Sequence, residues 1–76
     1  METAYVLVNT LLNEDTEVAK AIRLLEGVKE VHLLYGVYDI IVKVEAESMA
    51  DLKQRVAAID KITDVRSTLK MILISP

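Results

Sequence analysis

The stretch Leu-Leu-Tyr-Gly-Val-Tyr-Asp-Ile-Ile-Val-Lys-Val, residues 33–44, decides how the chain folds. Two apolar runs flank Gly36, and glycine accepts the positive φ of a tight hairpin turn without steric cost. The stretch therefore predicts a β-hairpin, in which one strand ends just before this glycine and a second covers residues 38–45. Tyr38 and Asp39 begin the second strand, so polar groups gather at the mouth of an apolar hairpin.

The segments on either side of the hairpin predict two more strands and two helices. Residues 3–10 are rich in β-branched and apolar side chains on both sides, as in a central strand. Residues 65–74 read as the last strand. In two places apolar residues recur at the i, i+4, i+7 spacing of one helical face. These residues are Val18, Ile22 and Leu25 in the first helix and Leu52, Val56 and Ile59 in the second.

A shift of 34 residues aligns the first half of the sequence with the second. It aligns Val6 with Ile40 in the strands and Val28 with Ile62 after the helices. Each half is then a strand, a helix and a strand. Two such halves joined by a hairpin give the β-α-β-β-α-β order of the ferredoxin-like α+β fold, a four-stranded antiparallel sheet with both helices on one face. We expect one domain over residues 1–76.

The alternation of side chains along the strands separates the two faces of the predicted sheet. The face toward the helices is expected to hold Val6, Val8, Ile40, Val42 and Val44. The open face is expected to carry six large apolar residues, with His32 and Lys43 toward its edges. The six are Tyr5, Leu7, Leu34, Ile41, Ile72 and Ile74. Such a patch is unusual for a soluble monomer, so we predict a homodimer that packs sheet against sheet through these residues.

Composition and charge argue against several functions. The net charge is −3 and no run of lysine or arginine occurs, which argues against direct binding to nucleic acid. The chain has no cysteine, and its single histidine, His32, has no clustered partner, so we expect no disulfide, metal or cofactor. No apolar run approaches the roughly 20 residues that cross a bilayer, and no signal peptide is visible. We therefore expect a cytoplasmic protein that does not contact membranes.

Sequence motifs for catalysis are also missing. No serine stands in a nucleophile-elbow context, and the two glycines are too far apart for a phosphate-binding loop. RNA-binding modules of the same fold present aromatic side chains on a basic sheet face, whereas the open face predicted here is aliphatic. We expect a protein that is not an enzyme.

Four motifs occur in an order and spacing that match a known family. They are Ala4–Thr10, the Gly-Val-x-x-Val step at Gly27–Val31, the Gly-x-Tyr-Asp hairpin at Gly36–Asp39 and the Val-x-x-Thr strand at Val65–Thr68. Over essentially its whole length the chain resembles the effector (RAM) domain of the leucine-responsive regulatory protein and asparagine-regulator family, Lrp/AsnC. The resemblance implies sheet-to-sheet dimers that assemble further, commonly into octamers. It also implies that an amino-acid effector binds between dimers, near the Gly-x-Tyr-Asp hairpin.

The resemblance assigns roles to individual positions. The implied ligand-binding residues are Tyr35, Gly36, Tyr38, Asp39, Thr68 and Lys70. Asp39 would pair with an α-ammonium group, and Thr68 would offer a hydroxyl. Tyr35 stands where the family often has threonine and could narrow the pocket, while Lys70 replaces the second threonine of a Thr-x-Thr pair and could favour an acidic ligand. Two readings stay open here: these changes alter specificity, or they mean that ligand binding has been lost. Spacing alone also allows Gly36, Tyr38 and Asp39 to be no more than hairpin residues.

Full-length members of the family carry an N-terminal helix-turn-helix domain that binds DNA. This chain begins at its first strand, so we expect a stand-alone module without that domain, able to join a full-length relative in a mixed assembly. The leading hypothesis is a non-enzymatic, amino-acid-sensing, oligomeric module of transcriptional regulation in amino-acid metabolism. The alternatives are a structural adaptor that co-assembles with full-length relatives without a ligand, and an ACT-type metabolic regulatory domain with the same order of strands and helices.

Overall fold

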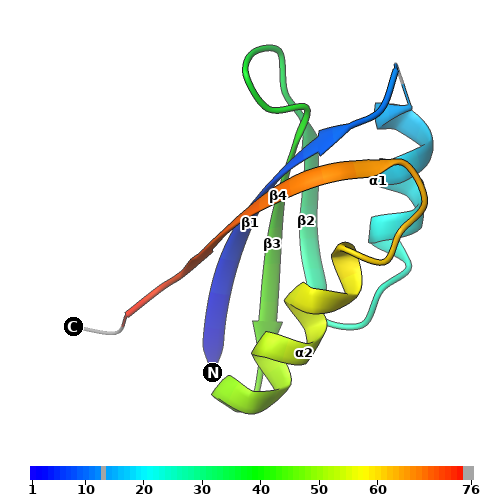
Figure 1. The fold of residues 1–76 in the computed structure, drawn as a ribbon. Helices are drawn as coiled ribbons and strands as arrows, with labels where there is room; N and C mark the ends of the chain where they lie inside the picture. Colours follow the sequence, from blue (N-terminus) through cyan, green and yellow to red (C-terminus); the bar gives the residue numbers. More distant parts are fainter. Residues whose placement is uncertain (13, 75–76) are drawn as a thin grey trace.

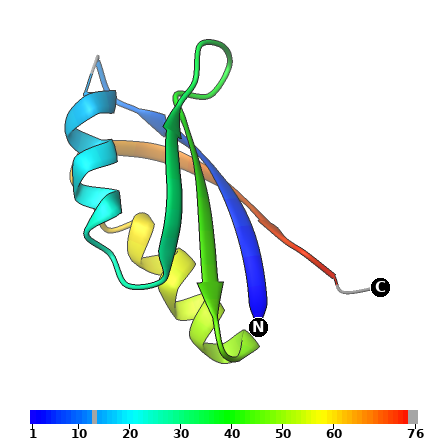
Figure 2. The ribbon, with the colours of Figure 1, turned by 180° about the vertical axis from the view of Figure 1, so that it is seen from behind.

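The computed structural model describes residues 1–12 and 14–74. Its elements are β1 (Glu2–Thr10), α1 (Asp15–Arg23), β2 (Val28–Leu33), β3 (Ile40–Ala46), α2 (Met49–Ile59) and β4 (Val65–Ile72). The strands form one antiparallel sheet in the order β2-β3-β1-β4, and both helices lie on one face of it (Figures 1 and 2). The predicted ferredoxin-like α+β fold is confirmed.

The core lies between the helices and the sheet. Every residue predicted for the helix-covered face is fully buried, which confirms that half of the face assignment: Val6, Val8, Ile40, Val42 and Val44. The helices contribute Val18, Ile22, Leu52, Val56 and Ile59 to the same cluster. Leu25 follows the end of α1 and is only partly buried against the core. Each fully buried valine, leucine or isoleucine contributes roughly 1.5–3 kcal/mol relative to an exposed one, so this layer supplies most of the stability of a short chain.

The helix ends follow the expected local chemistry. Ser48 caps α2, because its hydroxyl accepts a hydrogen bond from the Asp51 N–H at 3.2 Å. The first turn of α1 is acidic and its last turn is basic, an arrangement that complements the helix dipole. No helix in the described part of the chain is long and apolar enough to span a membrane.

The turn from α1 into β2 requires glycine at position 27. Gly27 has φ 86°, in the left-handed region, and its carbonyl accepts a hydrogen bond from the Glu45 N–H at 2.9 Å. A Cβ atom here would lie 2.7 Å from the Glu45 carbonyl oxygen and 2.6 Å from Cδ of Arg55. The backbone conformation and the close approach of β3 therefore both exclude a side chain.

The two halves of the chain do not repeat at a single spacing. The helix-to-strand turn contains a positive φ at Gly27 in the first half and at Asp64 in the second, 37 residues later, and Val28 and Val65 begin the strands that follow. The alignment of Val28 with Ile62 is therefore wrong. The physical reason is that α2 has 11 residues and α1 has 9, and the turn that follows α2 is one residue longer than the turn that follows α1.

The predicted tight turn at Gly36 is also wrong. Residues 34–39 connect β2 to β3, and Gly36 does not have the positive φ that a two-residue hairpin turn would require. Tyr38 and Asp39 belong to this connection and not to the strand. The Leu34 N–H closes the base of this loop by donating to the Asp39 carbonyl at 2.8 Å, and the Asp39 side chain bonds to Thr10 of β1.

The open-face assignment of Ile72 is wrong. Ile72 lies opposite Ala4 in the β1–β4 register, and residues that face each other across an antiparallel pair share a face. It therefore lies on the helix side and packs against the core. A register shift near the start of β4 sets this pairing, and a slip of one residue moves every side chain to the other face. Leu69 and Met71 occupy the open face instead.

Two other residues predicted for the open face lie beyond the ends of the strands. Ile74 follows β4 and is 90% exposed, so its predicted place on the sheet face is wrong. Leu34 follows β2 and donates its N–H to the Asp39 carbonyl at 2.8 Å, which places it at the base of the connecting loop. Of the six predicted residues, Tyr5, Leu7 and Ile41 lie within strands on the open face.

Candidate functional site

The open face of the sheet carries an apolar strip that no helix of the chain covers (Figures 1 and 2). The strip consists of Tyr5, Leu7, Ile41, Leu69 and Met71, from three adjacent strands. Leu7 lies at its centre, between Ile41 of β3 and Leu69 of β4. Leu69 and Met71, on the edge strand, are 45% and 41% exposed. An apolar strip of this kind on a bare sheet face favours a protein contact.

Charged side chains border the strip on the β2 side. Lys43 Nζ lies 3.7 Å from a carboxylate oxygen of Glu30 and 3.7 Å from one of Glu45. Nε2 of His32, on the edge strand β2, lies 3.2 Å from the Glu30 carboxylate. The hydrogen bond with His32, together with the charge of Lys43, lowers the pKa of Glu30 below its usual value. The open face therefore has an apolar centre and a polar rim, the usual anatomy of a protein interface.

The loop formed by residues 34–39 projects beyond the end of the sheet (Figure 1, green). Tyr35 and Val37 at its tip are almost fully exposed, and a Cβ at Gly36 would meet nothing within 4 Å. Tyr38 and Asp39 are half-buried where the loop rejoins the sheet. Four of the six predicted ligand-binding residues thus share one loop, which presents apolar surface at its tip and a carboxylate at its base.

Thr10 anchors the Asp39 carboxylate. Asp39 Oδ2 accepts a hydrogen bond from the Thr10 N–H at 2.8 Å and another from the Thr10 hydroxyl at 3.2 Å. The Asp39 N–H donates to the Val8 carbonyl at 2.9 Å. The carboxylate therefore ties the base of the loop to the end of β1, 29 residues away in sequence. A local turn bond, the alternative considered from spacing, is not what this side chain makes.

Thr68 and Lys70 form a second cluster on the helix side of β4. The Thr68 hydroxyl donates to Oδ1 of Asp60 at 2.7 Å, and Lys70 Nζ lies 2.6 Å from Oδ2. Asp60 is the C-cap residue of α2. Partial burial works to raise the pKa of Asp60, but the hydrogen bonds from Lys70 and Thr68 and the charge of Lys70 lower it on balance. The structure therefore places the six predicted ligand-binding residues in two clusters, on opposite sides of β1.

Sequence reasoning missed two residues of these clusters. Thr10 bonds to Asp39, which is 29 residues away in sequence. Asp60 bonds to Thr68 and Lys70, which are 8 and 10 residues away. The partners belong to different helices, strands or loops, so no pattern within one element connects them. The signal that could have found Asp60 is its place at the end of α2. The chain turns back there into β4, so Asp60 lies close to that strand.

The Asp60 cluster predicts a pH-dependent contribution to stability. Because the folded pKa of Asp60 is lowered, its contribution is fully present above the usual carboxyl pKa and is lost as the pH falls through the lower folded value. The Asp60 side chain is 43% exposed, so we expect Lys70→Met to cost less than about 1 kcal/mol near neutral pH and less still at about pH 2. Urea unfolding at both pH values measures the difference.

Lys20→Met is the matched control for this experiment. Lys20 pairs with Glu17 at 3.2 Å on the surface of α1, where both side chains are about two-thirds exposed. The control should change the unfolding midpoint less than Lys70→Met at neutral pH. A Lys70→Met deficit that stays constant from neutral to acid pH would contradict the role given to Asp60.

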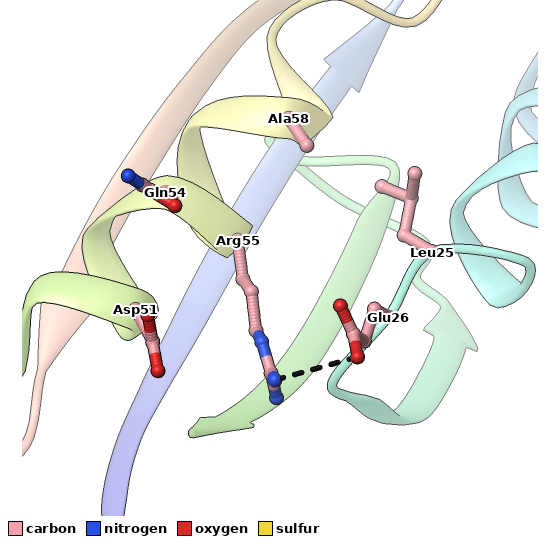
Figure 3. Close-up of a pocket in the computed structure, with 6 residues that line it drawn as sticks. All are labelled: Leu25, Glu26, Asp51, Gln54, Arg55 and Ala58. Atoms are coloured by element: carbon pink, nitrogen blue, oxygen red, sulfur yellow. Dashed lines mark ion pairs between the residues drawn. The ribbon is translucent and has the colours of Figure 1, made fainter. Parts of the chain in front are cut away.

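A groove of about 430 Å³ lies between α2 and the α1–β2 turn (Figure 3). Its lining includes the ion pair between Arg55 and Glu26, at 3.6 Å. Arg55 thus reaches across to the turn between α1 and β2. The guanidinium also donates to the Glu45 carbonyl at 2.8 Å. Arg55 is thus committed to holding the turn at Gly27, and we assign no ligand to this groove.

The fold and the open face define a small α+β module with an apolar strip on its bare sheet face. The family model for the Lrp/AsnC ligand binding domain matches residues 3–76. The chain therefore belongs to the Lrp/AsnC ligand-binding domain family, a family of regulatory domains found in transcription regulators.

Several known proteins are similar to this chain in structure or in sequence. The structure of the hypothetical protein PHS023 from Pyrococcus horikoshii is 36% identical with a TM-score of 0.90, and the match covers 100% of this chain and 93% of that one. AsnC of E. coli shares the fold at a TM-score of 0.84 and 22% identity, over 99% of this chain and 52% of that chain. Homocitrate synthase from Sulfolobus acidocaldarius is 42% identical over 59 residues, which cover 78% of this chain and 13% of that enzyme. The chain thus spans a small part of the curated relatives that it matches.

Proposed function

We propose that this chain is a non-enzymatic module that binds an amino-acid effector and self-associates through the open sheet face, in the regulation of amino-acid metabolism. The observation that carries the proposal is the match to the Lrp/AsnC ligand binding domain over residues 3–76. A regulatory domain needs a site for its effector and a means of passing on the binding event. The two features described above, the projecting loop and the apolar strip, are suited to these two tasks.

The apolar strip supports self-association. A second copy of the same surface is complementary to it in chemistry, with an apolar centre against an apolar centre. Two-fold symmetry would bring each residue of the strip near its equivalents on the other copy. Burial of apolar surface at about 25 cal/mol per Å² favours this contact, and the losses of freedom on association oppose it. We expect a dimer, and we expect dimers to associate further into a ring such as an octamer.

The projecting loop supports effector binding between copies. A free amino acid offers an ammonium group, a carboxylate and a side chain. Asp39 carries the negative charge for the ammonium, and Tyr35 and Val37 offer apolar surface to the side chain. Thr68 and Lys70 lie in the other cluster, so a ligand held between copies could contact the loop of one copy and the β4 cluster of another. An effector stabilises whichever assembly binds it better. A rise in effector concentration would therefore shift the population toward that assembly.

The match to homocitrate synthase favours a second candidate function. A segment of that enzyme is 42% identical to 59 residues of this chain, so a domain of this kind also occurs within an enzyme of metabolism. The effector site would then control an enzyme activity in place of transcription. The adaptor reading, in which the module only joins assemblies of longer relatives, predicts no effector at all.

Thermal unfolding in the presence of each standard L-amino acid tests the proposal. A ligand at about 100 times its dissociation constant adds about 2.7 kcal/mol, which raises the Tm of a domain this size by roughly 10 °C or more. Asp39→Ala should remove that shift, because the ammonium loses its partner. Asp51→Ala, on the exposed side of α2, is the matched control and should keep it. No response to any amino acid at millimolar concentration would favour the adaptor.

A further inference from the structure

The pairing of β1 with β3 ends before β1 does. The last β1–β3 pair is Val8 with Ile40, but β1 continues to Thr10. No residue of β3 lies opposite Thr10, because that part of the chain belongs to the loop of residues 34–39. The Thr10 N–H therefore lacks the partner that a longer β3 would have offered. Oδ2 of Asp39 takes that place at 2.8 Å, and the Thr10 hydroxyl adds a second bond at 3.2 Å.

We infer that Thr10 is a positioning residue, which uses its N–H and its hydroxyl to fix the Asp39 carboxylate and, through it, the loop of residues 34–39. Hydrogen bonds to an ionised carboxylate are stronger than those between neutral groups, and two of them on one oxygen define the plane of the carboxyl group. Both bonds fall on Oδ2. Within residues 1–12 and 14–74 no hydrogen bond to Oδ1 is found, so the second oxygen is left to face a ligand. This last step rests on the proposed function, and the fixing of the loop does not.

The loop has little else to hold it. Its tip makes no apolar contact that buries Tyr35 or Val37, and Gly36 stands in open space. At its base the Leu34 N–H donates to the Asp39 carbonyl at 2.8 Å, and the Asp39 N–H donates to the Val8 carbonyl at 2.9 Å. All of these anchors pass through Asp39. The orientation of that residue therefore sets the orientation of the loop. The Val8 carbonyl holds the Asp39 backbone, and Thr10 holds the Asp39 side chain.

Amide hydrogen exchange on the whole 76-residue chain tests this directly. Thr10→Val removes the hydroxyl but keeps the size and the backbone N–H, and Thr10→Ser keeps the hydroxyl. The amides of Leu34 and Asp39 are the ones hydrogen-bonded at the base of the loop. We expect them to exchange about 5–10-fold faster in Thr10→Val, the effect of one lost hydrogen bond, and to stay within about twofold of the wild type in Thr10→Ser. Thr63→Val, at an exposed threonine near the end of α2, is the control and should leave these rates unchanged.

Asp39→Asn separates the anchoring role from charge. An asparagine side-chain oxygen can still accept both bonds from Thr10, so exchange in the loop should remain close to that of the wild type, whereas Asp39→Ala should match or exceed the effect of Thr10→Val. The inference is overturned if Thr10→Val exchanges like the wild type, if Thr63→Val gives the same acceleration, or if Thr10→Val adds its full effect on top of Asp39→Ala.

Calorimetric titration with L-leucine, L-asparagine and L-glutamate tests the consequence for ligands. For any of the three that binds the wild type, Thr10→Val should weaken binding about 3–10-fold, and Thr10→Ser should stay within about twofold of the wild type. Equal affinity in Thr10→Val and wild type would overturn the ligand part of the inference. If none of the three binds the wild type, the proposed function loses support, while the exchange rates still decide whether Thr10 positions the loop.

Discussion

Replacing Gly27 with alanine is expected to lower the free energy of unfolding by about 2–5 kcal/mol, which would unfold much of a domain this small. Two terms add. The left-handed backbone at φ 86° costs an alanine about 1–2 kcal/mol. The new Cβ would also lie 2.7 Å from the Glu45 carbonyl oxygen, which accepts a hydrogen bond from Arg55 of α2. The backbone oxygen of a central strand cannot move aside cheaply, unlike the end of a flexible side chain.

Gly36→Ala is the matched control, because it is the other glycine of the chain. Gly36 lies outside the left-handed region, and nothing stands within 4 Å of its Cβ position. We expect a change within about 0.5 kcal/mol, or a small gain from the reduced freedom of the unfolded chain. Urea unfolding of both variants makes the comparison. Equal losses in the two would mean that the turn at Gly27 is not the tight site described here.

Replacing Leu7 with aspartate is expected to split the self-associated protein into monomers. Leu7 lies at the centre of the apolar strip, so in a sheet-to-sheet dimer its replacement would bury an unpaired carboxylate. That burial costs about 3–5 kcal/mol, and a symmetric dimer would contain the change twice. The dissociation constant should therefore rise more than about a hundredfold. Because this face is bare in the single chain, the monomer itself should still fold, and circular dichroism would confirm it.

Leu24→Asp controls for the chemistry of this change. Leu24 is 88% exposed at the end of α1, on the helix side of the molecule, away from the strip. A carboxylate at a helix C-terminus is expected to cost a few tenths of a kcal/mol up to about 1 kcal/mol of stability, with no effect on a dimer built through the sheet. If Leu24→Asp dissociates the protein and Leu7→Asp does not, the interface lies on the helices and the strip has been misassigned.

Periodicity predicted the fold and the buried face well, because both depend on patterns that repeat along the chain. Val6, Val8 and Val42 could be placed from alternation, since neighbouring strand residues must point to opposite faces. Each of these signals lies within about ten residues of the element that it predicts.

The errors have a different origin, because they depend on register between segments distant in sequence. Every residue from Leu69 to Ile74 except Lys70 is apolar, so alternation in β4 could not say which set faces the helices. The register shift opposite the end of β1 decides which residues of β4 face the helices, and nothing in the sequence of β4 marks that shift. The loop at Gly36 was misread for a similar reason. Its base is held by bonds from Asp39 to Thr10 and Val8 of β1, contacts that only the folded sheet creates.

The candidate site could be predicted in part. Family resemblance pointed to the hairpin and to Thr68 and Lys70, but not to the groups that hold them. Thr10 and Asp60 are ordinary residues in sequence and become important through the antiparallel return of the chain. A sequence motif identifies residues of a site, but the fold determines which of them lie in contact.

The mass of the protein in solution tests the central claim most directly, that a second copy covers the open sheet face. Light scattering at micromolar concentration should give twice the 8.5 kDa of the chain or a higher even multiple, and Leu7→Asp should reduce it to 8.5 kDa. A wild-type protein that is already a folded monomer of 8.5 kDa, with its apolar strip open to water, would contradict the account.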